Sequence, residues 1–174
     1  LQRVKRISEA VGPEVDRMSD VYGPPWLTVS DAIQLGKAVE EYDLLFYEKT
    51  KQFITEHRKN HPQQPFFAVF STQIAHAPVL PAPEFYGATK AGPRGDFVWE
   101  LDVLVGRVLD LVEELGIDEE TLILFSADNG AETMHVHWMR EDNEQDASGG
   151  WRGMKRDDWV GGHRVPFIAR WQSG

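Results

Sequence analysis

Two stretches of the chain carry hydrophobic residues at helical spacing. One runs from residue 30 to about residue 58 and has Ser30 as its N-cap. The other begins at Phe97, steps by three and four positions to Leu115, and is followed by Gly116, a residue that commonly ends helices. Each stretch therefore predicts a helix with one buried face.

Three short apolar runs predict buried strands. They are "FFAVF" at 66–70, "LILFS" at 122–126 and "VPFIARW" at 165–171. A proline-containing loop and the second helix separate the first two runs, and this order is typical of a right-handed crossover between parallel strands. The pattern therefore predicts an α/β fold with a mostly parallel sheet flanked by helices.

Two polar segments carry no such pattern. Residues 1–30 are rich in turn formers and are left unassigned. Residues 131–150 end in two glycines and are expected to form a mobile surface loop. Alternate acids at 142, 144 and 146 faintly resemble a calcium-binding loop, but Ala147 stands where that loop needs glycine, so we reject the match.

Composition narrows the class of protein. The 174 residues are 41% hydrophobic, enough for one domain with a core, and the net charge of −10 argues against nucleic-acid binding. The chain has no cysteine, which excludes disulfides and zinc–thiolate sites within it. No apolar run approaches the roughly 20 residues that span a bilayer. The chain does not begin with Met, and we expect it to be a piece of a longer protein.

Polar residues follow two of the predicted strands directly. Asp128 and Asn129 come just after Ser126, and His76 comes six residues after Phe70. Parallel strands place their carboxyl ends at one edge of a sheet, where ligands bind. Adjacent carboxylate and amide oxygens suit calcium or magnesium. The alternative is a plain turn at Asp-Asn-Gly and a surface histidine, and the residues alone leave both open.

Further candidates follow later in the chain. Lys155 lies in a glycine-containing, basic stretch, although a single lysine is ordinarily solvated. His135 and His137 either reach the same pocket or lie on the surface. Trp138 and Trp151 flank the polar segment and are candidates for stacking on a sugar or aryl ring.

Three blocks of this sequence together resemble the sulfatase family. They are "PFFAVFSTQIAHAP", "LDVLVGRVLDLVEELGIDEETLILFSADNGAE" and "WRGMKRDDWVGGHRVPFIARW", in the order that the family has. The resemblance covers about residues 40–174 and implies a partial alkaline-phosphatase-like sandwich. Residues 1–174 would then be a single, incomplete catalytic domain.

The resemblance also implies roles for individual residues. Asp128 and Asn129 match two ligands of the active-site calcium. His76 matches the histidine that contacts the sulfate and protonates the leaving oxygen, and Lys155 matches the lysine that holds a sulfate oxygen. At the end of the last block, four residues match positions of the family that have a structural role: Gly161, Gly162, Arg164 and Pro166. Val160 and Gln172 differ from the residues that the family usually has at their positions.

Other family features have no counterpart in these residues. The nucleophile of the family is a formylglycine made from Cys or Ser in Cys/Ser-x-Pro-x-Arg, and no segment fits that pattern. We expect that motif and the remaining calcium ligands upstream, so the chain alone is expected not to hydrolyse sulfate esters.

The expected activity of the complete enzyme is that of a calcium-dependent sulfuric ester hydrolase acting on a small-molecule or carbohydrate sulfate ester. Two alternatives stay open, a phosphomonoester or phosphodiester hydrolase of the same superfamily and a non-catalytic domain that binds an anion or glycan. The family suggests a periplasmic or secreted location. The sequence names neither the substrate nor the oligomeric state.

Overall fold

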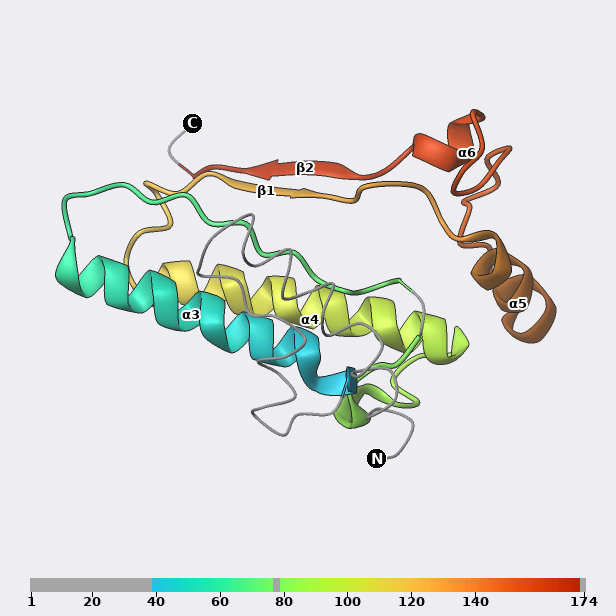
Figure 1. Ribbon diagram of the computed structural model, residues 1–174, viewed down its shortest axis with the longest axis horizontal. Coiled ribbons are helices and arrows are strands. Elements are labelled where there is room, and N and C mark those ends of the chain that lie inside the picture. The colour runs from blue at the N-terminus through green and yellow to red at the C-terminus, as the bar shows by residue number, and fades with distance from the viewer. Residues whose placement is uncertain (1–38, 77–78, 173–174) are drawn as a thin grey trace, which may run out of the picture.

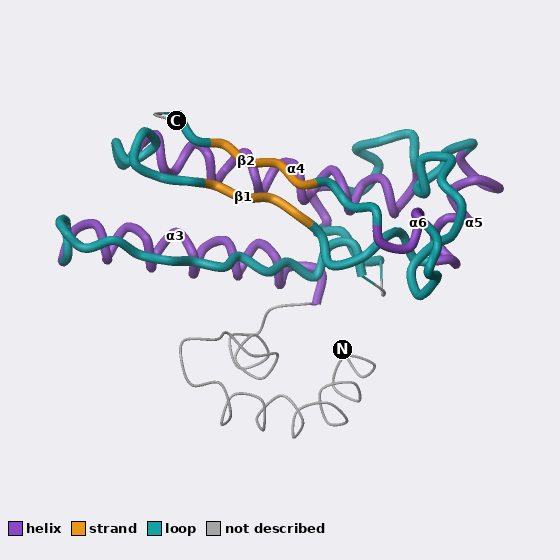
Figure 2. The backbone as a smooth tube through the Cα atoms, turned by 90° about the horizontal axis from the view of Figure 1, so that it is seen from above, coloured by secondary structure: helices purple, strands orange, loops and turns teal. Residues whose placement is uncertain are grey.

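The computed structural model describes residues 39–76 and 79–172. Two long helices lie side by side, α3 (Tyr42–Asn60) and α4 (Gly92–Glu114), and a hairpin-like pair of strands lies over α4 (Figure 1). The short helices α5 (Thr133–Asn143) and α6 (Val160–His163) lie together at one end (Figures 1 and 2). The described residues also form two 3-10 turns, η1 (Val39–Glu41) and η2 (Pro83–Phe85).

The two predicted helices form, with changed bounds. The first ends at Asn60, and its predicted start at Ser30 lies outside the described residues. The second starts earlier than predicted, at Gly92, because Pro93 stands in its first turn, where proline needs no hydrogen-bond partner for its nitrogen.

The C-terminus of α4 follows the prediction. Gly116 has φ +62° and donates its N–H to the carbonyl of Glu113 at 2.9 Å. The N–H of Ile117 donates to the carbonyl of Val112 at 3.0 Å, which completes a Schellman motif. Ile117 then packs into a buried cluster with Ile54 of α3 and Leu111 of α4, so this helix end also joins the two helices.

The sheet differs from the expected one. Strands β1 (Ile123–Ser126) and β2 (Phe167–Arg170) pair antiparallel, with Ile123 opposite Arg170. The run 66–70 forms no strand, and the predicted parallel crossover is therefore wrong for the described residues. The physical reason is that no strand among the described residues pairs with this run, and Phe67 (87% exposed) and Val69 (60% exposed) are correspondingly uncovered.

The direction of that segment nevertheless agrees with the prediction. The extended chain after α3 runs alongside β1 in the same direction, and both head toward the end where α5 and α6 lie (Figures 1 and 2). His76 and Asp128 each follow these segments, so both lie toward the same end of the molecule. The α/β class therefore holds, although the described part of the sheet has two strands.

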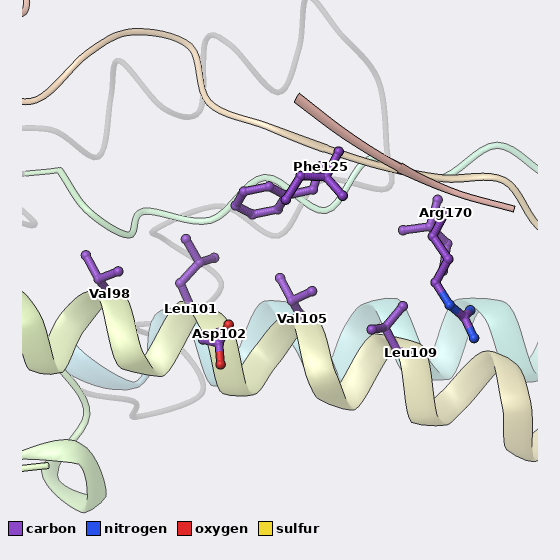
Figure 3. A pocket seen from close by; sticks show the side chains of 9 residues that line it. Val98, Leu101, Asp102, Val105, Leu109, Phe125 and Arg170 are labelled. Carbon is purple, nitrogen blue, oxygen red and sulfur yellow. The ribbon is translucent and has the colours of Figure 1, made fainter. Parts of the chain in front are cut away.

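One face of the sheet covers α4 loosely. Side chains of α4, among them Leu101, Val105 and Leu109, point toward Phe125 and Arg170 of the sheet (Figure 3). An apolar cavity of about 250 Å³ remains between the two layers. None of the candidate site residues lines this cavity, so it belongs to the packing of the sheet rather than to the candidate chemistry.

The segment 131–150 is also different from the prediction. Residues Thr133–Asn143 form helix α5 instead of a mobile loop. Val136 is fully buried, and Asp146 holds the following turn by accepting hydrogen bonds from Arg140 and from Ser148.

No helix within the described residues combines the length and the hydrophobicity that are needed to span a bilayer.

Candidate active site

Two backbone hydrogen bonds join the end of β1 to the segment before β2. The N–H of Gly130 donates to the carbonyl of Gly162 at 2.9 Å, and the N–H of Lys155 donates to the carbonyl of Ala131 at 2.8 Å. These bonds bring Lys155 beside the Asp-Asn-Gly turn, although some 25 residues separate them in the sequence. The candidate lysine and the candidate metal ligands thus share one corner of the fold.

Four glycines make this approach possible, and we call them the glycine seam: Gly130, Gly153, Gly161 and Gly162. A Cβ on Gly130 would collide with the carbonyl oxygen of Gly161, and a Cβ on Gly161 would collide with that of Gly153. A Cβ on Gly162 would collide with the carbonyl oxygen of Asp157. Backbone passes so close to backbone here that any side chain would push the two segments apart.

Asp128 and Asn129 lie at the tip of β1. The carboxylate of Asp128 is exposed, and the side-chain amide of Asn129 donates to the carbonyl of Gly130 at 2.9 Å. Because the side-chain nitrogen of Asn129 is the donor in that bond, its side-chain oxygen is the atom that would contact a ligand. Both side chains offer oxygen donors of the kind that hard cations take. No group of three or more His, Cys, Asp or Glu residues that could hold a metal ion occurs within residues 39–76 and 79–172.

The surroundings of Lys155 are mixed in charge. Its side chain is half-buried, and it interacts electrostatically with Glu132. Glu132 accepts a hydrogen bond of 2.7 Å from Arg156, and this bond, more than the field of Lys155, holds the pKa of the Glu132 carboxyl below its usual range. Arg156 is paired with the carboxylate of Glu132, whereas the ammonium of Lys155 has no hydrogen-bonded acid of its own in the described structure.

His76 reaches the same region from the other side. It is exposed and ends a tight turn in which its N–H donates to the carbonyl of Gln73 at 2.7 Å. His76 also acts electrostatically on His135, which lies in the first turn of α5, three residues after Glu132. His76 therefore lies close to the helix that begins beside Lys155 and the turn of Asp128.

Two basic side chains near His76 have a buried nitrogen without a hydrogen-bond partner among the described residues. His135 is 2% exposed, and its Nδ1 has no hydrogen-bond partner among the described residues. Arg94, in the first turn of α4, is partly buried, its Nη1 also has no partner within residues 39–76 and 79–172, and its charge acts on His135. Burial, followed by the charges of Arg94 and His76, lowers the pKa of His135. Sequence reasoning missed Arg94, because an arginine in a helix carries no signal of its own.

Other candidates lie at the surface. His137 is exposed, and Trp138 is half-exposed with its ring 5.9 Å from that of His135. The guanidinium of Arg164 lies 4.1 Å from the ring centre of Trp151, which is also half-exposed. The two predicted tryptophans are therefore accessible, but the stacking partner that the structure gives Trp151 is an arginine.

A family model and several known proteins match this chain. The model described as Sulfatase matches residues 10–174. The chain belongs to the sulfatase family. It is 32% identical to the N-acetylgalactosamine-6-O-sulfatase of Bacteroides thetaiotaomicron over 133 residues, which cover 71% of this chain and 24% of that protein. It is 35% identical to the N-acetylgalactosamine-6-sulfatase of Mus musculus, covering 73% of this chain and 23% of the relative.

Solved sulfatase structures share the fold. A Bacteroides thetaiotaomicron sulfatase from a locus that orchestrates the metabolism of multiple glycosaminoglycans superposes with a TM-score of 0.69 and 29% identity, covering 78% of this chain and 28% of that one. The PsFucS1 sulfatase of Pseudoalteromonas sp. gives 0.64 and 33%, covering 77% and 25%. The sulfatase chain described here thus spans about a quarter of the length of these relatives, and its fold is that of the alkaline-phosphatase-like α/β class.

Proposed function

We propose that this chain is the part of a calcium-dependent sulfuric ester hydrolase that supplies a general acid, a sulfate-binding lysine and two metal ligands. The proposal rests mainly on the hydrogen bond between Lys155 and Ala131, which joins the segment of the lysine to the segment of the metal ligands. Membership of the sulfatase family supports the reaction type.

The chemistry of these residues suits sulfate ester hydrolysis. Breaking the S–O bond builds negative charge on the sulfuryl oxygens and on the leaving oxygen. The ammonium of Lys155 offsets charge on a sulfuryl oxygen, and the imidazole of His76 donates a proton to the leaving oxygen. Histidine suits this role because its ordinary pKa lies near neutral pH.

The oxygens of Asp128 and Asn129 fit a calcium ion in donor type, and two ligands are fewer than the six to eight that calcium takes. When bound, the cation would offset further charge on the sulfate group. Asp128 and Asn129 would hold it from the tip of β1, and the backbone hydrogen bonds of Gly130 and Lys155 support their nearness to the lysine segment.

We infer a sulfated carbohydrate or aryl substrate. Two relatives are named for N-acetylgalactosamine 6-sulfate, and the half-exposed rings of Trp138 and Trp151 offer flat apolar faces of the kind that sugars and aryl groups stack on.

The test is the binding of 4-nitrophenyl sulfate to the 174-residue chain in calcium chloride, followed by NMR. We expect chemical-shift changes to gather at His76, Asn129 and Lys155. His76→Ala and Lys155→Ala should each weaken binding about tenfold or more, because each removes a charge-assisted contact. The matched controls are His61→Ala and Lys59→Ala at the far end of α3, which should leave the affinity unchanged. Shift changes elsewhere, or equal losses in the controls, would overturn the proposal.

A further inference from the structure

Two buried carboxyl groups on neighbouring helices contact the loop that carries His76. Asp43, in the first turn of α3, is 4% exposed, and Glu100, in the middle of α4, is fully buried. Neither forms an ion pair in the described structure, so their role is not charge pairing. The described parts of the His76 loop are residues 73–76 and 79–82.

Asp43 holds the first end of this loop. Its Oδ1 accepts a hydrogen bond of 2.7 Å from the N–H of Gln73, and the carboxylate also accepts one from the N–H of Ile74. The carbonyl of Gln73 in turn accepts the N–H of His76 at 2.7 Å. Only two hydrogen bonds therefore separate the carboxylate of Asp43 from the backbone of His76.

Glu100 holds the second end. Its Oε2 accepts a hydrogen bond of 2.9 Å from the N–H of Ala82, which is fully buried, while its Oε1 has no partner in the described structure. Leaving a backbone N–H without a partner inside the protein is unfavourable, so both acids satisfy donors that would otherwise be left unpaired.

The charge of Asp43 also acts on Glu100. Burial raises the pKa of Asp43 to about 6, against the lowering effect of its two backbone hydrogen bonds. Burial raises the pKa of Glu100 to about 7; the charges of Asp43 and Glu84 add to this rise, and the hydrogen bond from Ala82 and the charge of Arg107 oppose it. Burying two neighbouring carboxyl groups away from water costs free energy. That cost favours a role that requires their oxygen atoms.

We propose that Asp43 and Glu100 are positioning residues that hold His76 in place by fixing both ends of its loop. The proposal rests on the proposed role of His76 in binding the sulfate ester. Asp43 acts on the turn that ends at His76, and Glu100 keeps the return of the chain against α4. Both act from rigid helices, which suits the fixing of a side chain that must meet a leaving oxygen.

The structure provides a matched control on α4. Asp96 is 3% exposed and accepts hydrogen bonds of 2.8 Å from the N–H groups of Gly87 and Thr89. It is a buried acid that fixes a neighbouring loop one turn away from Glu100, but not the loop of His76. Its removal should disturb the chain to a similar degree without moving the histidine.

The experiment measures amide exchange and His76 ring signals by NMR in the 174-residue chain, together with the affinity for 4-nitrophenyl sulfate. Asp43→Ala should speed exchange at Ile74 and Gln73 about tenfold or more, shift the ring signals of His76 and weaken the affinity about tenfold. Asp43→Asn, which keeps an acceptor oxygen, should restore most of each effect. Asp96→Ala should speed exchange at Gly87 and leave the His76 ring signals unchanged.

Two results would separate the possible failures. Unchanged His76 signals and affinity in Asp43→Ala, while His76→Ala still weakens binding, would overturn the positioning role alone. No effect of His76→Ala on binding would overturn the proposed function itself. If Asp43→Ala does not fold, the same measurements are made on Glu100→Met. We expect faster amide exchange at Ala82 and the same changes in the His76 ring signals and in the affinity. Unchanged His76 signals in Glu100→Met would also overturn the positioning role.

Discussion

Replacing Gly161 by alanine tests whether the glycine seam fixes the site. The added Cβ would collide with the carbonyl oxygen of Gly153 and lie 2.9 Å from its carbonyl carbon and 3.0 Å from the carbonyl oxygen of Arg152. These are backbone atoms, so no side chain can rotate away. Relief requires the two segments to separate, which would break the 2.8 Å hydrogen bond from the N–H of Gly161 to Arg152.

The expected magnitude combines two contributions. Overpacking of this kind costs about 1–3 kcal/mol, and the lost hydrogen bond costs about 1 kcal/mol. The sum, about 2–4 kcal/mol, corresponds to roughly 30-fold to 1000-fold faster local opening at the bond between Gly130 and Gly162. We expect that increase in the hydrogen exchange of the Gly130 amide, together with weaker binding of 4-nitrophenyl sulfate.

The control lies in α4. A Cβ on Gly106 would meet no atom within 4 Å, so Gly106→Ala should stabilise the helix by about 0.5–1 kcal/mol in urea unfolding and leave the exchange of Gly130 unchanged. Exchange of Gly130 in Gly161→Ala within about threefold of wild type would refute the reasoning, because the seam would then tolerate a side chain.

Three further outcomes are expected. Leu104→Ala, at a fully buried position of α4, should lower the free energy of unfolding in urea by about 2–5 kcal/mol. Val98→Ala, at a half-exposed position of the same helix, should lower it by less than about 1 kcal/mol. Similar losses in both variants would contradict the described packing. The folded-state pKa values of Asp43 and Glu100 lie above their unfolded values, so these two groups bind more protons in the folded chain between about pH 4 and pH 8, and their contribution to the free energy of unfolding should fall as pH rises. Glu100→Gln should therefore make the slope of the free energy of unfolding against pH less negative, and an unchanged slope would count against the assignment. Arg156→Gln should change the free energy of unfolding by less than about 1 kcal/mol, since its ion pair is largely exposed, and a larger loss would show a structural role.

Features set by local sequence were predictable. The spacing of apolar residues and the glycine after Leu115 gave the end of α4, because a Schellman motif depends on residues within one turn. The start of α4 was missed because "GPRGD" has the composition of a turn. The same limit applied to α5, whose polar sequence is helical because Val136 and His135 pack inward.

Features set by distant partners were not predictable. The run 66–70 has the composition of a strand, yet composition does not tell whether a pairing partner lies beside it. Asp43 and Glu100 look like ordinary surface acids of helices, and only their contacts with a remote loop mark them out.

The candidate site also has a part that the sequence predicts and a part that depends on distant contacts. The sequence and its family resemblance singled out His76, Asp128, Asn129 and Lys155, and their roles stay predictions. What the sequence did not contain was the means of bringing these segments together. The resemblance marked Gly161 and Gly162 as structural residues, but no local pattern indicates that they make close backbone contacts with Gly153 and Gly130.

The most direct measurement of the central claim is hydrolysis by a chimera. Residues 40–174 would replace the homologous segment of the Bacteroides thetaiotaomicron N-acetylgalactosamine-6-O-sulfatase, and hydrolysis of N-acetylgalactosamine 6-sulfate would be followed in calcium chloride. We predict an active chimera in which His76→Ala and Lys155→Ala each lower kcat/KM about 100-fold or more, while His61→Ala leaves it unchanged. A folded chimera without activity, or one that keeps full activity without His76 and Lys155, would contradict the account.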